Sequence, residues 1–142
     1  MARGYRLGPG RRLVNVLVTA LLRAGLGPPR TYLLGVRGRK SGRTLTTPVT
    51  LVEDGGRRWL VAPYGDVGWV KNARAAGVVT LRRGRRVETV RIVELPPEEA
   101  APVLRRYVTE APITRPFFDV TPSSDLAAFR AEAPRHPVFR LG

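Results

Sequence analysis

The fold class is decided by residues 33–52, which read LLGVRGRKSGRTLTTPVTLV. Two apolar runs rich in Leu, Val and Thr flank the segment Gly38-Arg39-Lys40-Ser41-Gly42-Arg43. Such runs on both sides of a glycine-bounded turn are typical of a β-hairpin, because glycine adopts positive φ and allows a close approach of the backbone. The segment therefore predicts two antiparallel strands joined by a short cationic turn.

The same turn has the composition of an anion site. Arg39, Lys40 and the Ser41 hydroxyl would stand beside exposed backbone amides, and these groups together bind phosphate or carboxylate. A solvated hairpin tip in a very basic protein explains the same residues equally well. The residues alone leave both interpretations open.

Turn signals and periodicity divide the rest of the chain into short elements. Strands are expected at 30–37, 44–53, 57–62, 78–82, 86–94 and 137–141. Helices are expected at 13–26, 69–76, 98–108 and 123–133, with an irregular stretch at 112–121. Pro48 indicates a sheet edge or a bulge, because proline cannot donate to a β-ladder.

Five or six antiparallel strands with a few helices predict a mainly β, α+β fold, in the form of a small barrel or a strongly curled sheet. The length of the chain fits one domain over residues 1–142. Residues 1–12 are basic and glycine-rich, and we expect them to be mobile. The sequence contains neither a GxGxxG dinucleotide loop nor a Walker phosphate loop.

The predicted helix at 13–26 is strongly apolar but too short to span a bilayer, which takes ~20 apolar residues. We expect it to pack on the core. The alternative is peripheral attachment of residues 1–26 to an anionic membrane, since four arginines precede the apolar stretch. These arginines are Arg3, Arg6, Arg11 and Arg12.

Charge is the strongest deviation in composition. The net charge is +14, and only Lys40 and Lys71 are lysines among 25 cationic residues. This excess favours anionic partners: nucleic acid, an acidic membrane or a polyanionic small molecule. The arginine turn at 82–86 supports nucleic acid, but aromatic residues do not alternate with the basic strands as a stacking platform requires. We therefore expect a solvated face at 82–86 with weak, nonspecific affinity for nucleic acid.

Several kinds of catalytic centre are excluded by composition. The chain has no cysteine and a single histidine, His136, so it offers no thiolate nucleophile and no multi-histidine metal site. No Ser-His-Asp triad and no metal-ligand spacing of acids is evident. An enzyme of this composition needs a bound cofactor to carry the chemistry. The sequence lacks a signal-peptide pattern, so a cytoplasmic location is the expectation.

Taken together, Gly38, Arg39, Ser41, Gly42 and Pro48, followed by Trp69 and Asn72, resemble the deazaflavin-dependent nitroreductase family. Its members carry a hairpin close to G-R-x-[ST]-G-x-x-x-x-x-P and then W-x-x-N. The resemblance covers residues 33–95 and weakens toward both ends. Where the family reads Asn-Pro after the second motif, this chain has Ala76-Gly77, which affects only the exit of a helix.

The resemblance implies a split β-barrel of the FMN-binding type that binds reduced coenzyme F420, a deazaflavin with a phosphate and a glutamate tail. FMN is the alternative cofactor. Carried over by position, the turn residues would hold the phosphate and the tail, and the following strand and loop would lie along the ring. The implied cofactor-binding residues are Arg37, Arg39, Lys40, Ser41, Arg43, Thr47, Pro48, Val49, Ala62, Pro63, Tyr64, Gly65, Gly68, Lys71, Asn72 and Arg74.

The implied reaction is hydride transfer from the reduced deazaflavin to a quinone, an enone or a nitroaromatic compound. The protein would align the acceptor and stabilise negative charge. The candidates for the acceptor pocket are Tyr64, Trp69, Tyr107, Phe117 and Phe118. The segment Arg115-Pro116-Phe117-Phe118-Asp119 stands where nitro-reducing members carry tyrosines, which argues against nitro compounds as acceptors. A non-catalytic or FMN-binding split barrel and a basic nucleic-acid-binding protein stay open, as does the choice between monomer and homodimer.

Overall fold

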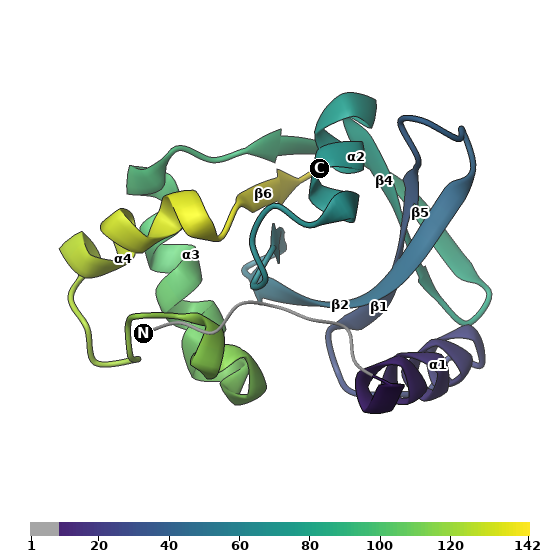
Figure 1. Ribbon diagram of the computed structural model, residues 1–142, viewed down its shortest axis with the longest axis horizontal. Helices are drawn as coiled ribbons and strands as arrows, with labels where there is room; N and C mark the ends of the chain where they lie inside the picture. Colours follow the sequence, from purple (N-terminus) through teal and green to yellow (C-terminus); the bar gives the residue numbers. More distant parts are fainter. Residues whose placement is uncertain (1–8) are drawn as a thin grey trace.

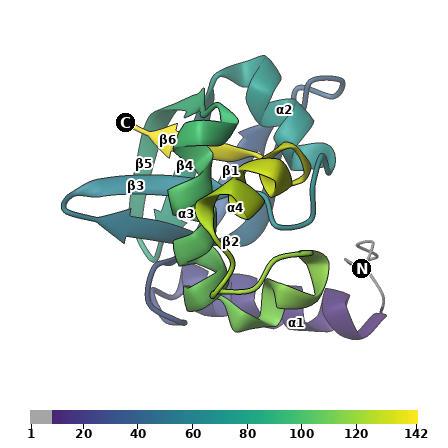
Figure 2. The same cartoon turned by 90° about the vertical axis from the view of Figure 1, so that its left-hand side faces the viewer.

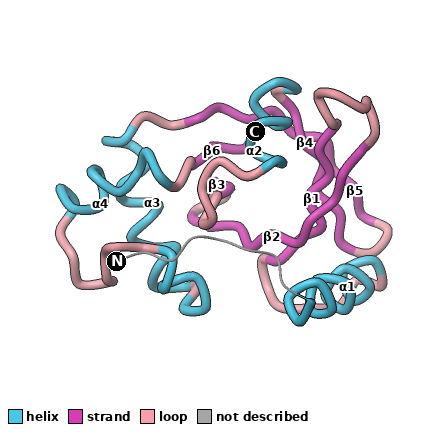
Figure 3. Tube along the Cα trace, in the orientation of Figure 1, coloured by secondary structure: helices cyan, strands magenta, loops and turns pink. Residues whose placement is uncertain are grey.

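The computed structural model of the chain describes residues 9–142. Its centre is a closed barrel of antiparallel strands in the order β1-β2-β3-β6-β5-β4, as Figures 1 and 3 show. The strands β1 to β6 span Thr31–Arg37, Thr44–Asp54, Arg57–Val61, Val78–Arg83, Arg86–Glu94 and Val138–Leu141. The predicted split barrel is confirmed, and no predicted strand end differs by more than one residue.

The helices surround the barrel. They are α1 (Pro9–Arg23), α2 (Gly68–Ala76), α3 (Pro97–Glu110) and α4 (Leu126–Glu132), with the 3-10 turns η1 (Pro112–Phe117) and η2 (Ala133–Arg135). Helix α4 begins later than predicted because the Asp125 carboxylate accepts a hydrogen bond from the Ala128 amide (2.9 Å) and so caps its first turn.

The bounds predicted for the first helix were wrong at both ends. Helix α1 begins at Pro9, so residues 9–12 are helical rather than part of a mobile lead-in, and the rest of that predicted lead-in lies outside the described residues. The helix ends at Arg23 because Gly25 follows with φ 79°, a left-handed conformation that glycine adopts without strain. None of the described helices is long and apolar enough to cross a membrane.

The long strand β2 is shared between two partners. Its first part pairs with β1, from Thr44 opposite Arg37 to Thr50 opposite Thr31. Its last part pairs with β3, beginning at Leu51 opposite Leu60. Pro48 therefore lies in the part of β2 that pairs with β1 alone, before the pairing with β3 begins. The other side of β2 has no strand partner there within residues 9–142, so the missing N–H of proline costs no ladder hydrogen bond, as the sequence predicted.

Two apolar clusters hold the fold together. One fills the barrel and includes Leu34, Leu60, Leu81 and Phe139. The other lies between the barrel and the α3–α4 pair, where Leu104 and Phe129 are fully buried. Figure 2 shows α3 and α4 side by side against one side of the barrel. The second cluster therefore fixes the C-terminal helices to the strands that line the site described below.

Helix α1 packs on the barrel more lightly than expected. It contacts β1, β2 and β4, but Leu22 is its single fully buried side chain among residues 13–23. The Gly84 amide donates to the Leu22 carbonyl (2.6 Å), and the half-buried Arg83 guanidinium donates to the carbonyls of Gly27, Pro28 and Thr31. The expectation of a solvated Arg83 is therefore wrong, because this side chain fixes the α1–β1 connection.

A substitution at Gly35 tests how closely the β1–β2 hairpin packs against β4. A Cβ at this position would lie 2.3 Å from Thr80 Oγ1, too close for any side chain. We expect Gly35→Ala to lower the free energy of unfolding by about 1–3 kcal/mol, the usual cost of overpacking. Urea unfolding measures this. Gly68→Ala is the matched control, since its Cβ would meet no heavy atom within 4 Å. Adding Thr80→Ala to Gly35→Ala should restore part of the loss; no restoration would contradict the assigned clash.

Candidate active site

The predicted site residues gather around two hollows at the two ends of α2. One, here called the turn groove, has a volume of about 780 Å³ and lies between the β1–β2 turn, the end of α2 and the start of β4. The other, the ring cavity, has a volume of about 460 Å³ and lies between α1, the middle of β2, the β3–α2 loop and the end of α3. A helix rises 1.5 Å per residue, so α2 separates the hollows by ~12 Å.

The turn that forms the groove needs its glycines. The Gly38 amide donates to the Arg43 carbonyl (2.7 Å) and the Gly42 amide to the Gly38 carbonyl (2.9 Å), which closes the turn. A Cβ on Gly38 would lie 2.7 Å from Ser41 Oγ, and Gly42 has φ 72°. The Ser41 hydroxyl oxygen accepts from the Arg43 amide (3.2 Å), so its own proton can be donated to a ligand.

A single buried oxygen orients the leading arginine of the turn. Asn72, on α2, is only 4% exposed, and its Oδ1 accepts hydrogen bonds from the Arg39 amide (3.1 Å) and from Arg39 Nη1 (2.7 Å). The amide thus joins α2 to the turn and fixes the direction of the Arg39 guanidinium, leaving its remaining N–H groups for another acceptor. Asn72 therefore acts on the groove through Arg39.

The other predicted cations divide into two groups. Arg37, Lys40, Arg43 and Lys71 are exposed and form no ion pair within residues 13–142. Arg74 is engaged elsewhere: it pairs with Glu94 (2.8 Å) and Asp66 (3.0 Å), and hydrogen bonding to Glu94 raises its pKa above the usual range. The structure therefore brings Arg37, Arg39, Lys40 and Ser41 together at the groove. Arg74 does not line the groove, and its charge is neutralised by Glu94 and Asp66.

The ring cavity contains most of the residues predicted to lie along the ring. Its walls include Thr47, Pro48, Val49, Pro63, Tyr64, Gly68, Trp69 and Tyr107. Sequence reasoning missed the contribution of α1 and of the α3–η1 junction, which add Asn15, Val18, Ile113 and Thr114. No local signal in the sequence marks these residues, because they reach the cavity only through the tertiary arrangement.

The aromatic candidates do not all face the cavity. Tyr64 and Tyr107 line it, whereas Phe117 and Phe118 are buried in the cluster beneath α3. Phe117 packs edge-on against Tyr64, with ring centroids 4.8 Å apart, and so supports the cavity wall from behind. Trp69 lines the cavity and also packs near Phe139 of the barrel core. Both the core and the ligand-facing interpretations therefore apply to Trp69.

Tyr107 is the phenol at the α3 side of the cavity. It is 5% exposed, burial raises its pKa well above the usual value, and it is hydrogen-bonded with Thr114. A phenol in this state keeps its proton throughout the neutral range. Because the Thr114 hydroxyl donates its own proton to the Ala111 carbonyl (2.7 Å), the Tyr107 hydroxyl can donate either to Thr114 Oγ1 or, in exchange for that bond, to an oxygen that gains negative charge in the cavity.

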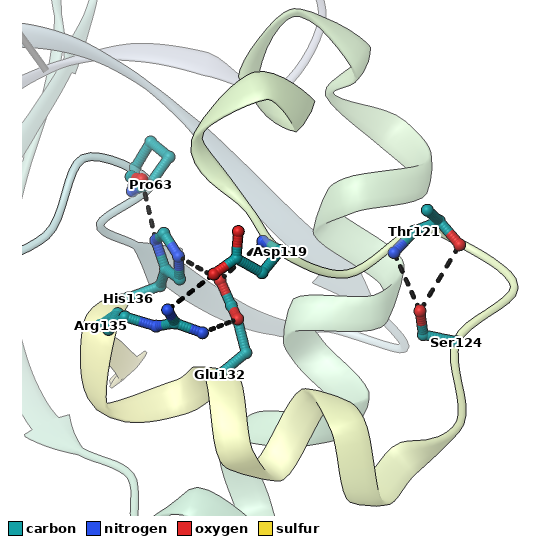
Figure 4. A network of polar contacts seen from close by, with 7 residues as sticks. All are labelled: Pro63, Asp119, Thr121, Ser124, Glu132, Arg135 and His136. Atoms are coloured by element: carbon teal, nitrogen blue, oxygen red, sulfur yellow. Dashed lines mark hydrogen bonds and ion pairs between the residues drawn. The ribbon is translucent and has the colours of Figure 1, made fainter. Parts of the chain in front are cut away.

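The single histidine has a positioning role that the sequence did not reveal. His136 Nδ1 donates to the Pro63 carbonyl (2.8 Å), and its Nε2 lies 2.8 Å from Glu132 Oε1 (Figure 4). Glu132 in turn accepts from the Asp119 amide and binds Arg135. Burial lowers the pKa of His136, and the Glu132 carboxylate offsets part of that shift.

A second bond fixes the same loop. The Ala62 amide donates to the Pro137 carbonyl (2.8 Å), directly beside the bond from His136 to Pro63. The Phe118 ring stacks on the imidazole with centroids 3.8 Å apart. The β3–α2 loop, which carries Pro63, Tyr64 and Val67 to the ring cavity, is thus held by His136 and Pro137.

A closed split barrel with a cationic groove and a largely apolar cavity beside it is the architecture expected of a split-barrel oxidoreductase. Residues 13–116 match the F420H(2)-dependent quinone reductase family, which covers well over half of the chain. The chain belongs to this family and is an F420H2-dependent reductase, which confirms the resemblance predicted from the turn and the W-x-x-N motif. No curated protein sequence matches the chain significantly.

Solved structures agree on the fold. The F420-H2 dependent reductase FDR-A is 25% identical, with a TM-score of 0.57, and the match covers 80% of this chain and 95% of that one. A protein solved as a domain-swapped dimer is 21% identical, with a TM-score of 0.58, and the match covers 95% of this chain and all of that one. A putative pyridoxamine 5'-phosphate oxidase from Listeria innocua is 11% identical, with a TM-score of 0.54 and coverage of 91% and 92%. The last two show a shared fold only.

The protonated state of Tyr107 has a measurable consequence for stability. Its pKa is raised in the folded protein, so above pH ~10 the unfolded chain loses this proton while the folded chain retains it. The free energy of unfolding should therefore fall as the pH rises above ~10. Denaturant titrations between pH 9 and 11 measure this slope. Tyr107→Phe should flatten it, and Tyr32→Phe serves as the control; equal slopes for wild type and Tyr107→Phe would contradict the assignment.

Proposed function

We propose that the turn groove binds the phosphate and glutamate tail of F420H2, and that the ring cavity binds the deazaflavin and the acceptor. The observation that carries this proposal is the pair of hydrogen bonds that Arg39 donates to Asn72 Oδ1. These bonds hold the Arg39 guanidinium at the groove, beside the exposed Lys40. The three cations that line this groove, Arg37, Arg39 and Lys40, match a cofactor with several negative charges better than they match a hairpin tip.

The two hollows fit the two parts of the cofactor. A cationic, open groove suits the charged tail, and a cavity with Pro48, Val49 and Trp69 in its wall suits a planar ring. FMN, the alternative cofactor, carries one phosphate and no glutamates, so it leaves part of the cationic groove unused. Titration of the protein with F420 and with FMN, followed by fluorescence, distinguishes them.

The acceptor we propose is a quinone or a related conjugated carbonyl compound. When bound, F420H2 would supply a hydride to the acceptor, and the acceptor oxygen would gain negative charge and take its proton from solvent. Tyr107 is placed to donate a hydrogen bond to that oxygen, because its phenol lines the cavity and keeps its proton. Nitro compounds receive no comparable support, since Phe117 and Phe118 are buried rather than presented to the cavity.

Removal of the turn cations tests cofactor binding. A hydrogen bond to a charged group contributes ~1.5–3 kcal/mol, so Arg39→Ala or Lys40→Ala should raise the Kd for F420 roughly tenfold to a hundredfold. Added salt should weaken binding of intact F420 far more than binding of the deazaflavin without phosphate and tail. Isothermal titration at two salt concentrations measures both effects.

Two controls belong with this experiment. Arg130→Ala removes an exposed cation on α4, away from both hollows, and should leave the Kd unchanged. Both turn variants should reach normal turnover at saturating cofactor, because the turn groove does not contact the reacting ring. If Arg39→Ala and Lys40→Ala bind F420 as tightly as wild type, the groove is not the tail site.

Tyr107→Phe tests the acceptor assignment separately. Loss of one hydrogen-bond donor to developing charge costs about a hundredfold in turnover in well-studied cases. We expect the variant to lose about tenfold to a hundredfold in kcat with a quinone, with its Kd for F420 unchanged. Steady-state kinetics and cofactor titration provide the two readouts. Tyr32→Phe is the matched control, and an unaltered kcat for Tyr107→Phe would remove this residue from the reaction.

A further inference from the structure

A third hollow lies between helix α3 and the strands β2, β3 and β6. Its volume of about 510 Å³ is within the range of ~300–1,000 Å³ that is typical of small-molecule sites. Its wall shares no residue with the turn groove or the ring cavity. We call it the tryptophan pocket, because Trp59 forms part of its wall. Figure 2 shows β2 and β3 beside α3, the elements between which the pocket lies.

The sheet side of the pocket follows from the alternation of β3. Leu60 points into the barrel core, so Arg57 and Trp59 share the outer face of the sheet. Across the ladders, Trp59 lies directly opposite Val52 of β2 and Arg140 of β6. Residues opposite each other have Cβ atoms ~5 Å apart. Arginines therefore stand beside the indole on two sides, one across the ladder and one along the strand.

The helix side of the pocket is a single face of α3. Glu99, Pro102, Val103 and Arg106 line it at positions i, i+3, i+4 and i+7. Val103 is 8% exposed, and Val52 on the sheet side is 1% exposed. The depth of the pocket is therefore apolar. Trp59 is half-buried: it packs in part against the cluster beneath α3 and in part lines the pocket.

The cations of the pocket are only partly compensated. Arg106 pairs with Asp54 (3.3 Å) and with Glu110 (2.9 Å), so the acid at the end of β2 is neutralised. Arg57 and Arg140 are exposed and form no ion pair within residues 13–142. Two guanidinium groups are thus available on the side of the pocket that carries the indole.

We propose that the tryptophan pocket binds a planar aromatic carboxylate. The ring of the ligand would lie against the Trp59 indole, and the carboxylate would accept charge-assisted hydrogen bonds from Arg57 and Arg140. The planar fork of a guanidinium matches a carboxylate in geometry, which favours this anion over a simple halide. The proposal does not depend on the proposed function, because the pocket is separate from both hollows of that site.

Glu99 limits the charge that the ligand can carry. This carboxylate is exposed on the helix wall and forms no ion pair within the described part of the chain. It would repel the further negative charges of a polyphosphate or a dicarboxylate. A ligand with a single carboxylate therefore fits the pocket better than a polyanion does.

Titration of the full chain with 2-naphthoate tests the site. The chain has two tryptophans, and Trp59 lines the tryptophan pocket whereas Trp69 lines the ring cavity. Their indole N–H signals in a ¹H–¹⁵N correlation spectrum therefore report on the two places separately, and Trp59→Phe assigns them. The Trp59 signal should shift with a Kd of roughly 0.1–1 mM, as expected for a ligand of about a dozen heavy atoms. A shift of the Trp69 signal alone would place the ligand in the ring cavity and overturn the proposal.

Two further ligands separate the contributions of charge and ring. 2-Naphthamide has nearly the same shape without the charge, and cyclohexanecarboxylate has the charge without a flat ring. Each should bind at least tenfold more weakly than 2-naphthoate, because each loses one of the two kinds of contact. Equal Kd values for 2-naphthoate and 2-naphthamide would show that the arginines bind no carboxylate, which contradicts the proposal.

Substitutions of exposed residues complete the test without disturbing the core. Arg57→Gln combined with Arg140→Gln should raise the Kd for 2-naphthoate at least tenfold. Glu99→Gln should lower it about twofold to fivefold, since an exposed like charge is removed. Arg86→Gln is the matched control: it removes an exposed strand arginine outside the pocket and should leave the Kd unchanged. An unchanged Kd for the double arginine variant overturns the proposal.

Competition with the cofactor provides the last readout. Saturating F420 should leave the Kd of 2-naphthoate unchanged, because the tryptophan pocket has no wall residue in common with the turn groove or the ring cavity. Displacement of 2-naphthoate by F420 would place both ligands at one site and overturn the assignment of a separate pocket.

Discussion

The arrangement of the site depends on one acceptor atom. Asn72 Oδ1 binds both the backbone and the side chain of Arg39, so α2 and the β1–β2 turn cannot move independently of each other. Because Asn72 is buried, these bonds are protected from competition with water, and their loss would leave the buried Asn72 oxygen unsatisfied. The two ends of α2 contact the two hollows, so this tie also fixes the groove relative to the cavity.

The second constraint comes from a segment far along the chain. The β3–α2 loop would be an ordinary exposed connection, but His136 and Pro137 bind the first residues of that loop through two backbone groups. The imidazole is itself held by Glu132 and by stacking with Phe118. Under the proposed function a rigid loop matters, since alignment of the cofactor ring with the acceptor to within about half an ångström governs the rate of hydride transfer. Helix α4 and the segment 136–138 therefore support a cavity that they do not line.

Much of the fold was readable from local patterns. The strands were predicted almost to the residue because Leu33–Val36, Thr44–Val52 and Arg86–Glu94 combine β-branched runs with glycine turns. A motif with fixed spacing also predicted the turn cations that line the groove and the stretch around Pro48 that lines the cavity, whereas their contacts with a cofactor stay a prediction. The contributions of His136, Asn15 and Ile113 could not be predicted, because each reaches its partner across long sequence separations. Arg74 and Arg83 were misread for the same reason: the sequence shows a cation but not the carboxylates or carbonyls that bind it.

The way in which the barrel closes has a consequence for how the protein assembles. The β1–β2 and β4–β5 hairpins are local, whereas β6 pairs with β3 through residues such as Trp59 and Arg140, which lie about eighty positions apart. Closure must therefore come late, after the hairpins have formed. Until β6 arrives, β3 and β5 present open edges, and the bond from His136 to the Pro63 carbonyl cannot exist. Pairing of β6 thus closes the open edges of β3 and β5 and fixes the β3–α2 loop in the same step.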